Sequence, residues 1–575
     1  MSYLNTPRLT FSGQFQADPS TVNNDPTHYN NQTFEPSFQD YQSATDLNGW
    51  WNPDGTGNWR FMGCKVTSVT YQDGTSTNDP LLDPIIGMSI MDTDTRTAGK
   101  IVDLDSQQQM VSELWGFMVR IVSQDGTTMM KGDYDVAPFT NIWFNRSVDL
   151  SADSAAAAIY QSVVKNIKWN NSYLNSRYLN ELRSVSGRQL SIQFTVDRYN
   201  GDNTSPQFTL GRIVGSIGPS DESEPKQFVL GRQLFPASQR STVNYATALV
   251  DEKLKQIVLD MGNSLQFSTG GVVNETRDLR LMVSLSGGNL IEIGKINYSS
   301  PDWYMGTSGI CTFPLSDEQL AQIQQNPIVI MQVVTTPSDA FTLENTTTYA
   351  PVMTESTQYV RADKFVFRLN PADKCTVNFY ATNLGKALPN AQILIQDATA
   401  ATLGPDQTPP VGTPALEEFS RQNPVEITTD ENGQATLTFV APDPGNPRGY
   451  IDGQVYGLSY NLSTQKFSDC NQSNFISLLI FSGEPSPQFV PDWDNFIQPI
   501  MQQYANLYPL MSKGIFNLAD KTVVDNNAQI LKLVFSKDIH DSNFMPATRD
   551  LSAYKTKVIL DYLQSVIDKA DAATA

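Results

Sequence analysis

The chain has 575 residues, of which 40% are hydrophobic and only 17% are charged. This length corresponds to about three domains of ordinary size and is enough to bury a large core without disulfides. The net charge of −21 disfavours duplex nucleic acid and anionic membrane surfaces as partners, because both are bound mainly through Lys and Arg.

The N-terminus shows no basic segment followed by an apolar one, and no apolar run approaches the roughly 20 residues of a transmembrane helix. We therefore expect no membrane span and a cytoplasmic protein, with signal-independent export left open. The cysteines form no C-x-x-C pair and are expected to be buried, reduced, structural thiols. They are Cys64, Cys311, Cys375 and Cys470.

Histidine is scarce, since the chain contains only His28 and His540. Neither follows a Glu three residues earlier, so the paired Glu-x-x-His motifs of di-iron bundles are absent. H-E-x-x-H, the P-loop and the nucleophile elbow are absent as well. A Ser-His-Asp triad needs only one histidine and stays open, although no local motif supports it.

Residues 1–370 are expected to form a β-rich body with inserted helices. Strict alternation at 190–196 predicts a strand with one buried and one solvated face. The similar runs 207–212 and 227–232 are expected to be two strands of one sheet, separated by a turn at 218–220. Further strands are expected at 256–261, 279–285 and 328–334.

Three helices are expected to interrupt this sheet. Residues 153–169 place Ile159, Val163 and Ile167 on one stripe, and a second helix is expected at 174–183. A short third helix begins at a capping box formed by Ser316 and Gln319 and ends before Pro327.

Residues 371–482 are expected to form a β-sandwich, with strands at 376–380, 391–395 and 435–440. Asn432-Gly433 suits a tight hairpin, and 397–424 is expected to be a long exposed loop. The stretches 389–391 and 429–435 resemble the immunoglobulin-like modules of bacterial surface proteins.

Residues 483–575 are expected to be a helical C-terminal segment. Helices are expected at 492–508, kinked or split by Pro499, at 527–535, and at 552–569. The last has a packed face made of Ile559, Tyr562, Leu563, Val566 and Ile567. The expected fold class is therefore mainly β or α+β, with several domains.

Two segments are candidate sites. Trp50, Trp51, Trp59 and Arg60 surround a Gly-rich turn, where exposed aromatics could stack on a ligand; packing against the turn is the alternative. Asp92, Asp94, Asp103 and Asp105 could bind Ca²⁺, although Thr97 and Arg96 break the EF-hand pattern. The alternative is that these carboxylates cap turns and pair with Arg96 and Lys100. No other cofactor is expected.

Residues 545–552 could be a docking motif or an N-terminal cap for the last helix, with Asp550 or Ser552 accepting backbone N–H groups. His540 lies just upstream and could ligate haem iron or act as an acid or base; a surface or core histidine is the alternative.

These motifs also resemble a known family. The opening residues 7–13 and 23–26 resemble the start of VioB-type enzymes of violacein and chromopyrrolate synthesis, as do 52–60, 101–105, 259–263 and 545–552, in matching order. The resemblance implies oxidative coupling of two tryptophan-derived imines. Family members carry a second half that resembles a ferritin-like bundle, where metal chemistry is expected, and this sequence matches only the first half.

Three functions are compatible with these observations. The first is a non-catalytic binding or assembly protein, a scaffold that self-associates or docks a protein partner. The second is a subunit of a VioB-type coupling enzyme whose ferritin-like bundle is a separate polypeptide. The third is an exported effector or toxin component. Whether the chain is an enzyme stays uncertain, and we expect that it is not.

Overall fold

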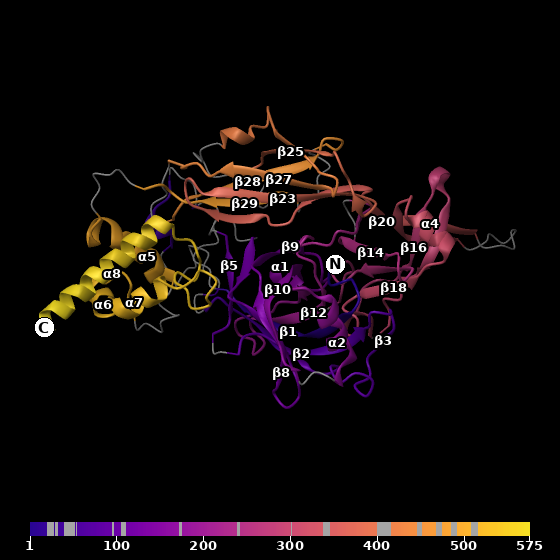
Figure 1. The fold of residues 1–575 in the computed structure, drawn as a ribbon, viewed down its shortest axis with the longest axis horizontal. Helices are drawn as coiled ribbons and strands as arrows, with labels where there is room; N and C mark the ends of the chain where they lie inside the picture. The colour runs from indigo at the N-terminus through magenta and orange to yellow at the C-terminus, as the bar shows by residue number, and fades with distance from the viewer. Residues whose placement is uncertain are drawn as a thin grey trace.

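The described part of the computed structural model contains four β-sheets and a C-terminal group of helices; in Figure 1 the third and fourth sheets lie above the first, the second sheet lies to the right and the helices lie to the left. The structure describes residues 1–19, 28, 33–39, 52, 55–94, 97–104, 111–171, 175–238, 242–268, 270–300, 302–336, 346–399, 416–445, 451–466, 474–484, 491–507 and 516–574. Within this part of the chain the fold is mainly β with several sheets, which confirms the expected fold class. No helix found there is long and apolar enough to cross a membrane.

The first sheet closes on itself, because β1 pairs with both β12 and β2. The closed path runs β1-β12-β11-β10-β8-β7-β4-β2, and β5, β6 and β9 bridge β2 to β10. Its strands are β1 Arg8–Asp18, β2 Asn58–Thr70, β3 Ser76–Thr77, β4 Ser89–Met91, β5 Gly99–Asp103, β6 Ser112–Trp115, β7 Met118–Val122, β8 Thr128–Tyr134, β9 Ala137–Trp143, β10 Ala157–Trp169, β11 Leu190–Asp197 and β12 Leu210–Pro219.

An aromatic core fills this first sheet, and α2 (Arg177–Val185) adds Tyr178, Leu179 and Leu182 to it. Ser176 begins α2 by accepting a hydrogen bond from the N–H of Leu179. Other short helices of this region are η2 Pro36–Gln39 and α1 Ala152–Ala155.

The second sheet is antiparallel and runs β17-β16-β19-β20-β13-β14-β15-β18. Its strands are β13 Arg232–Pro236, β14 Ala246–Asp251, β15 Gln256–Asp260, β16 Asp278–Ser284, β17 Leu290–Lys295, β18 Ile310–Pro314, β19 Ile328–Thr336 and β20 Thr346–Glu355. Its helices are η4 Ser286–Gly288, α3 Asp302–Met305 and α4 Asp317–Ile323. The predicted capping box of Ser316 and Gln319 begins α4, and the strands expected at 256–261, 279–285 and 328–334 are present as β15, β16 and β19.

The third and fourth sheets face each other across one shared core, as a sandwich does. One contains β21 Gln358–Ala362, β23 Lys374–Asn383, β24 Lys386–Ala387 and β27 Gln434–Val440. The other contains β22 Val366–Leu369, β25 Gln392–Asp397, β26 Val425–Thr428, β28 Gln454–Leu462 and β29 Phe475–Ile480. β21 and β22 therefore belong to the sandwich, although they precede the expected boundary at residue 371. The predicted strands are β23, β25 and β27, and η5 (Glu417–Phe419) follows the undescribed part of the 397–424 loop.

The C-terminal helices pack on a core of their own. They are η7 Trp493–Ile497, α5 Gln498–Leu507, α6 Lys521–Asn526, α7 Ala528–Phe535 and α8 Ala553–Thr574. The helix expected at 492–508 is split beside Pro499 into a π-helical turn and α5, as predicted. The predicted apolar face of α8 is confirmed, because Ile559 and Leu563 are fully buried in this core.

The helix predicted at 153–169 is wrong, because most of this segment is β10. Ile159, Val163 and Ile167 are spaced by four residues. That spacing keeps side chains near one face of a helix, but it is also an even number and keeps them on one face of a strand. This segment forms a strand because it pairs with β8, β9 and β11.

The strand pair predicted at 207–212 and 227–232 is also wrong. Only the last residues of each run are extended, in β12 and β13, and these strands belong to different sheets. Gly218 and Pro219 end β12 instead of forming the predicted turn. Asn432-Gly433 likewise joins β26 to β27 across the two sheets of the sandwich rather than closing a hairpin.

The strand predicted at 190–196 is β11, but the expected solvated face is buried as well. β11 lies between β10 and β12, and the second sheet covers its polar face, where Gly262 lies against Thr195. The alternation identified the strand correctly, whereas the covering of its polar face depends on residues far along the chain.

Candidate functional site

Trp59 is enclosed in the core of the first sheet and is only 1% exposed. Its ring centroid lies 5.0 Å from that of Phe117 and 5.4 Å from that of Phe194. Alternation along β2 turns Arg60 outward, where it lies 3.9 Å from a carboxylate oxygen of Asp92. Trp59 thus presents no face to a ligand here, in accord with the packing alternative. Trp50 and Trp51 lie outside the described residues.

The candidate calcium carboxylates are engaged separately. Asp92 is buried near Arg60, and burial raises its pKa. Asp94 pairs with Lys131 at 2.8 Å, and Asp103 accepts a hydrogen bond from Ser112. Asp105 lies outside the described residues, among which no group of three or more His, Cys, Asp or Glu could hold a metal ion. Calcium binding stays a prediction.

Of the two pairing partners expected for these aspartates, only Lys100 is described, and the structure gives it other acceptors. Lys100 instead donates to the carbonyl oxygen of Thr56 and to Oδ1 of Asn58, both at 2.8 Å. Arg96 lies outside the described residues.

His540 lies on the surface, with its side chain 66% exposed. Its Nδ1 is 2.9 Å from Oδ1 of Asp538, and its ring lies 5.5 Å from that of Trp115 in β6. His28 stacks on Phe38 at 4.2 Å. The position of His540 therefore fits the surface alternative.

The motif at 545–552 fastens the C-terminal helices to the rest of the molecule. Arg549 is 1% exposed, donates to the carbonyl oxygens of Asp541 and Ala547, and places its guanidinium 5.5 Å from the ring of Trp115. Ser552 accepts a hydrogen bond from the N–H of Lys555, which confirms the predicted cap of the last helix. Its own N–H donates to Asp452 of the sandwich at 2.9 Å.

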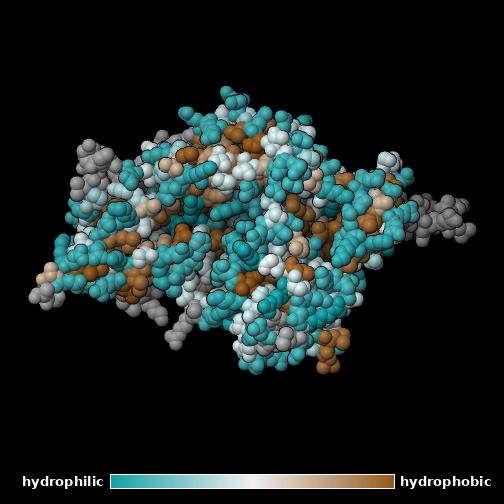
Figure 2. Space-filling model, viewed as in Figure 1, coloured by the Kyte–Doolittle hydropathy of each residue, from teal (hydrophilic) through white to brown (hydrophobic). Residues whose placement is uncertain are grey.

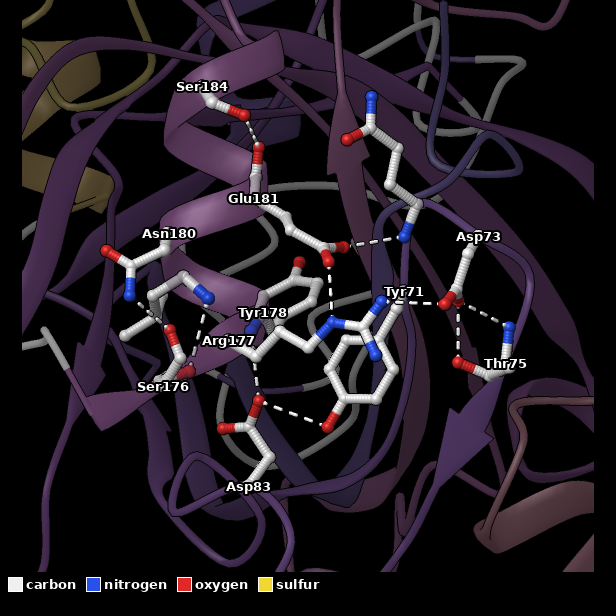
Figure 3. Close-up of polar contacts among 12 residues, drawn as sticks. Tyr71, Asp73, Thr75, Asp83, Ser176, Arg177, Tyr178, Asn180, Glu181 and Ser184 are labelled. Carbon is white, nitrogen blue, oxygen red and sulfur yellow. Dashed lines mark hydrogen bonds and ion pairs between the residues drawn. The ribbon is translucent and has the colours of Figure 1, made fainter.

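A polar cluster that the sequence did not reveal joins α2 to the loop after β2 (Figure 3). Oδ2 of the fully buried Asp83 accepts from the N–H of Tyr178 at 2.9 Å and from the hydroxyl of Tyr71 at 3.3 Å. Arg177 bridges Asp73 at 2.8 Å and Glu181 at 2.7 Å, and its guanidinium lies 4.0 Å from the ring of Tyr71.

Replacing Asp83 with alanine should lower the free energy of unfolding by about 2–3 kcal/mol, because buried donors of Tyr178, Tyr71 and Ile85 lose their acceptor. The matched control is Asp73→Ala, which removes an exposed partner of Arg177 and should cost at most about 1 kcal/mol. Urea denaturation measures both variants. Equal costs would contradict a special role for the buried carboxylate.

The described cysteines are free thiols; Cys64 and Cys375 are buried, as expected, whereas Cys311 is partly buried. Burial raises the pKa of Cys64 to about 12, that of Cys311 to about 11 and that of Cys375 to about 12. In a Cys470→Ser variant, which removes the cysteine outside the described residues, the native thiols should react with a disulfide reagent at pH 8 more than about a hundredfold slower than in urea. Fast reaction of a native thiol would contradict this.

A narrow polar pocket lies where the first sheet, the second sheet and the sandwich meet. Residues of β9, β10, β13, β14, β15 and β21 line it, together with residues 227–229 and Asn263. The space open to the centre of a water molecule is about 30 Å³, room for about two waters.

Asp260 lies in the wall of this pocket. Its Oδ2 accepts from the hydroxyl of Tyr3 at 2.6 Å and its Oδ1 from the N–H of Gly262 at 2.8 Å, and burial raises its pKa. Asp260 and Asn263 fall in the segment 259–263 noted for its resemblance, but no sequence signal connected them with Gln227 or Arg361.

No family model matches this chain. The enzyme 2-imino-3-(indol-3-yl)propanoate dimerase of Chromobacterium violaceum is 32% identical over 80 residues, which are 14% of this chain and 8% of that enzyme. The match supports a distant VioB-like resemblance. It spans less than a tenth of the curated relative.

Solved structures give weaker likenesses. Domains 1–6 of the surface layer protein SbsC align over 74% of this chain and 53% of that chain, with 9% identity and a TM-score of 0.14. Salmonella alpha-2-macroglobulin aligns over 83% of this chain and 31% of that chain, with 10% identity and a TM-score of 0.17. TM-scores this low carry no argument about fold or function.

Proposed function

We propose that this chain is a non-catalytic binding or assembly protein that self-associates, with a distant relation to the N-terminal region of VioB-type enzymes. The observation that carries the proposal concerns the buried polar groups of the chain. They connect one part of the molecule to the next, which suits a body that presents its surfaces in a fixed arrangement.

Three of these connections illustrate the point. Glu113 of the first sheet pairs with Arg368 of the sandwich, and both side chains are buried. Arg146, fully buried, donates to the carbonyl oxygen of Gly262 beside the second sheet at 2.7 Å. The N–H of Ser552 bonds Asp452 and so joins α8 to the sandwich. In this proposal the sandwich is an immunoglobulin-like module held in place by these contacts.

Light scattering on the purified full chain, over a concentration series, tests the proposal. A scaffold of this kind should give a mass of at least twice that of the 63.7 kDa protomer. A monodisperse monomer at every concentration would contradict self-association.

The match to the dimerase favours a second candidate, a subunit of an imine-coupling enzyme whose ferritin-like bundle is a separate chain. The two proteins should then co-purify, and adding this chain should raise the coupling rate. Failure of both would exclude the candidate. As a matched control, the coupling rate is also measured after adding the chain that carries Arg368→Met, a substitution that breaks the buried pair with Glu113.

A further inference from the structure

Three residues that line the pocket between the two N-terminal sheets and the sandwich each carry a buried polar atom without a hydrogen-bond partner. The atoms are Oε1 of Gln227, Oδ1 of Asn263 and Nη2 of Arg361. The three residues are 8%, 1% and 6% exposed. Buried polar atoms are normally satisfied, so these three atoms call for a partner, either water or a ligand.

The orientation of both amides is fixed by their nitrogen atoms. Nε2 of Gln227 donates to the carbonyl oxygen of Val136 at 3.2 Å, and Nδ2 of Asn263 donates to that of Asn141 at 2.8 Å. Each amide oxygen is therefore left as an acceptor. The two oxygens together call for a ligand with several donor hydrogens, such as an ammonium group.

Arg361, in contrast, is a hydrogen-bond donor and requires an acceptor on the ligand. Its Nη1 reaches the hydroxyl of Tyr359 only at 3.5 Å, and its guanidinium lies 5.4 Å from the ring of Phe228. Among the described residues no carboxylate forms an ion pair with it. Asp363 attracts this guanidinium electrostatically without forming an ion pair with it, so Nη2 is left without an acceptor, and a carboxylate matches the donor geometry of the guanidinium.

Asp260 and the volume of the pocket further limit which ligands fit. Asp260, in the same wall, already uses both carboxyl oxygens for Tyr3 and Gly262, so it offers the ligand no free hydrogen-bonding site. Two waters occupy about 60 Å³ in the liquid, which is close to the size of the smallest molecules that carry both charges.

We propose that this pocket binds the head group of a free amino acid, with its carboxylate on Arg361 and its ammonium on the amide oxygens of Gln227 and Asn263. Only a free amino acid carries both charges on one carbon, whereas the two ends of a peptide lie apart. A larger side chain would extend out of the pocket. This inference goes beyond the proposed function and does not depend on it.

Calorimetric titration of the full chain with glycine tests the assignment. Saturable binding is expected, and acetate or methylammonium, each with one of the two charges, should bind at least about tenfold more weakly, a loss of about 1.4 kcal/mol. Arg361→Met should abolish binding, and Gln227→Leu should weaken it. The matched control, Arg280→Met, removes an arginine of the second sheet that faces Asp278 and Glu292, and should bind glycine normally.

Line broadening of ¹³C-carboxyl glycine by the wild-type protein gives a second readout if Arg361→Met does not fold, and excess acetate should reverse it only partly. No saturable binding and no broadening would overturn the proposal and leave a pocket that holds water only. Equal binding of glycine by wild type and by folded Arg361→Met would overturn it as well.

Discussion

Replacing Glu355 with alanine should lower the free energy of unfolding by about 3–5 kcal/mol, because the guanidinium of Arg232 would stay buried without its counter-ion. The side chains of Arg232 and Glu355 are 2% and 1% exposed, and Glu355 receives two hydrogen bonds from Arg232. Glu355 also accepts from the N–H of Ile328, while Arg232 donates to carbonyl oxygens at the end of α4. The pair thus joins β13, β20 and α4.

Urea denaturation measures this effect against a matched ion pair on the surface. Asp561→Ala breaks an exposed pair with Lys557, whose side chains are 66% and 74% exposed, and should cost at most about 1 kcal/mol. The double variant Arg232→Met/Glu355→Leu removes both charges and should recover much of the loss, because no buried charge is left unpaired. A double variant as unstable as Glu355→Ala would contradict the electrostatic cause.

Replacing Trp59 with alanine should cost about 3–5 kcal/mol, because it leaves a cavity in the aromatic core of the first sheet. The indole packs among Phe15, Phe61, Phe117 and Phe194, with ring centroids 5.0–6.0 Å from its own. Trp59→Phe keeps part of this volume and should cost less.

The control for this substitution is Phe144→Ala, since Phe144 is 48% exposed and lies outside that core. Near-ultraviolet circular dichroism and urea denaturation should show a large change for Trp59→Ala and a small one for Phe144→Ala. If Trp59→Ala left stability unchanged, the tryptophan would not be a packing residue, and the ligand hypothesis for this segment would regain support.

Local signals in the sequence predicted the C-terminal helices and the caps well. Pro499 splits its helix, and Ser316 and Gln319 form their capping box. Ile559 and Leu563 of α8 face the core that the C-terminal helices share. Each of these signals acts within a few residues, so the local sequence is enough to predict where these helices begin, break and bury a face. The domain boundaries at 370 and 482 remain a prediction, although β21 and β22 join the sandwich before the first of them.

The candidate site could not be predicted in the same way. The pocket brings together Gln227, Asn263 and Arg361, which lie far apart in the sequence and share no motif, although Asn263 belongs to the segment 259–263 noted for its resemblance. Sequence patterns marked Trp59 instead, because an aromatic residue near a Gly-rich turn looks the same whether it faces a ligand or a core.

By itself, the sequence determined the mainly β class, the capped and packed C-terminal helices and the scarcity of histidine. Only the tertiary structure decided that residues 157–169 form a strand, that the polar face of β11 is covered, and that the buried carboxylates of Glu113 and Asp452 connect separate parts of the molecule. The physical reason is that a four-residue spacing fits both helix and strand, while burial and pairing depend on residues brought together from distant parts of the chain.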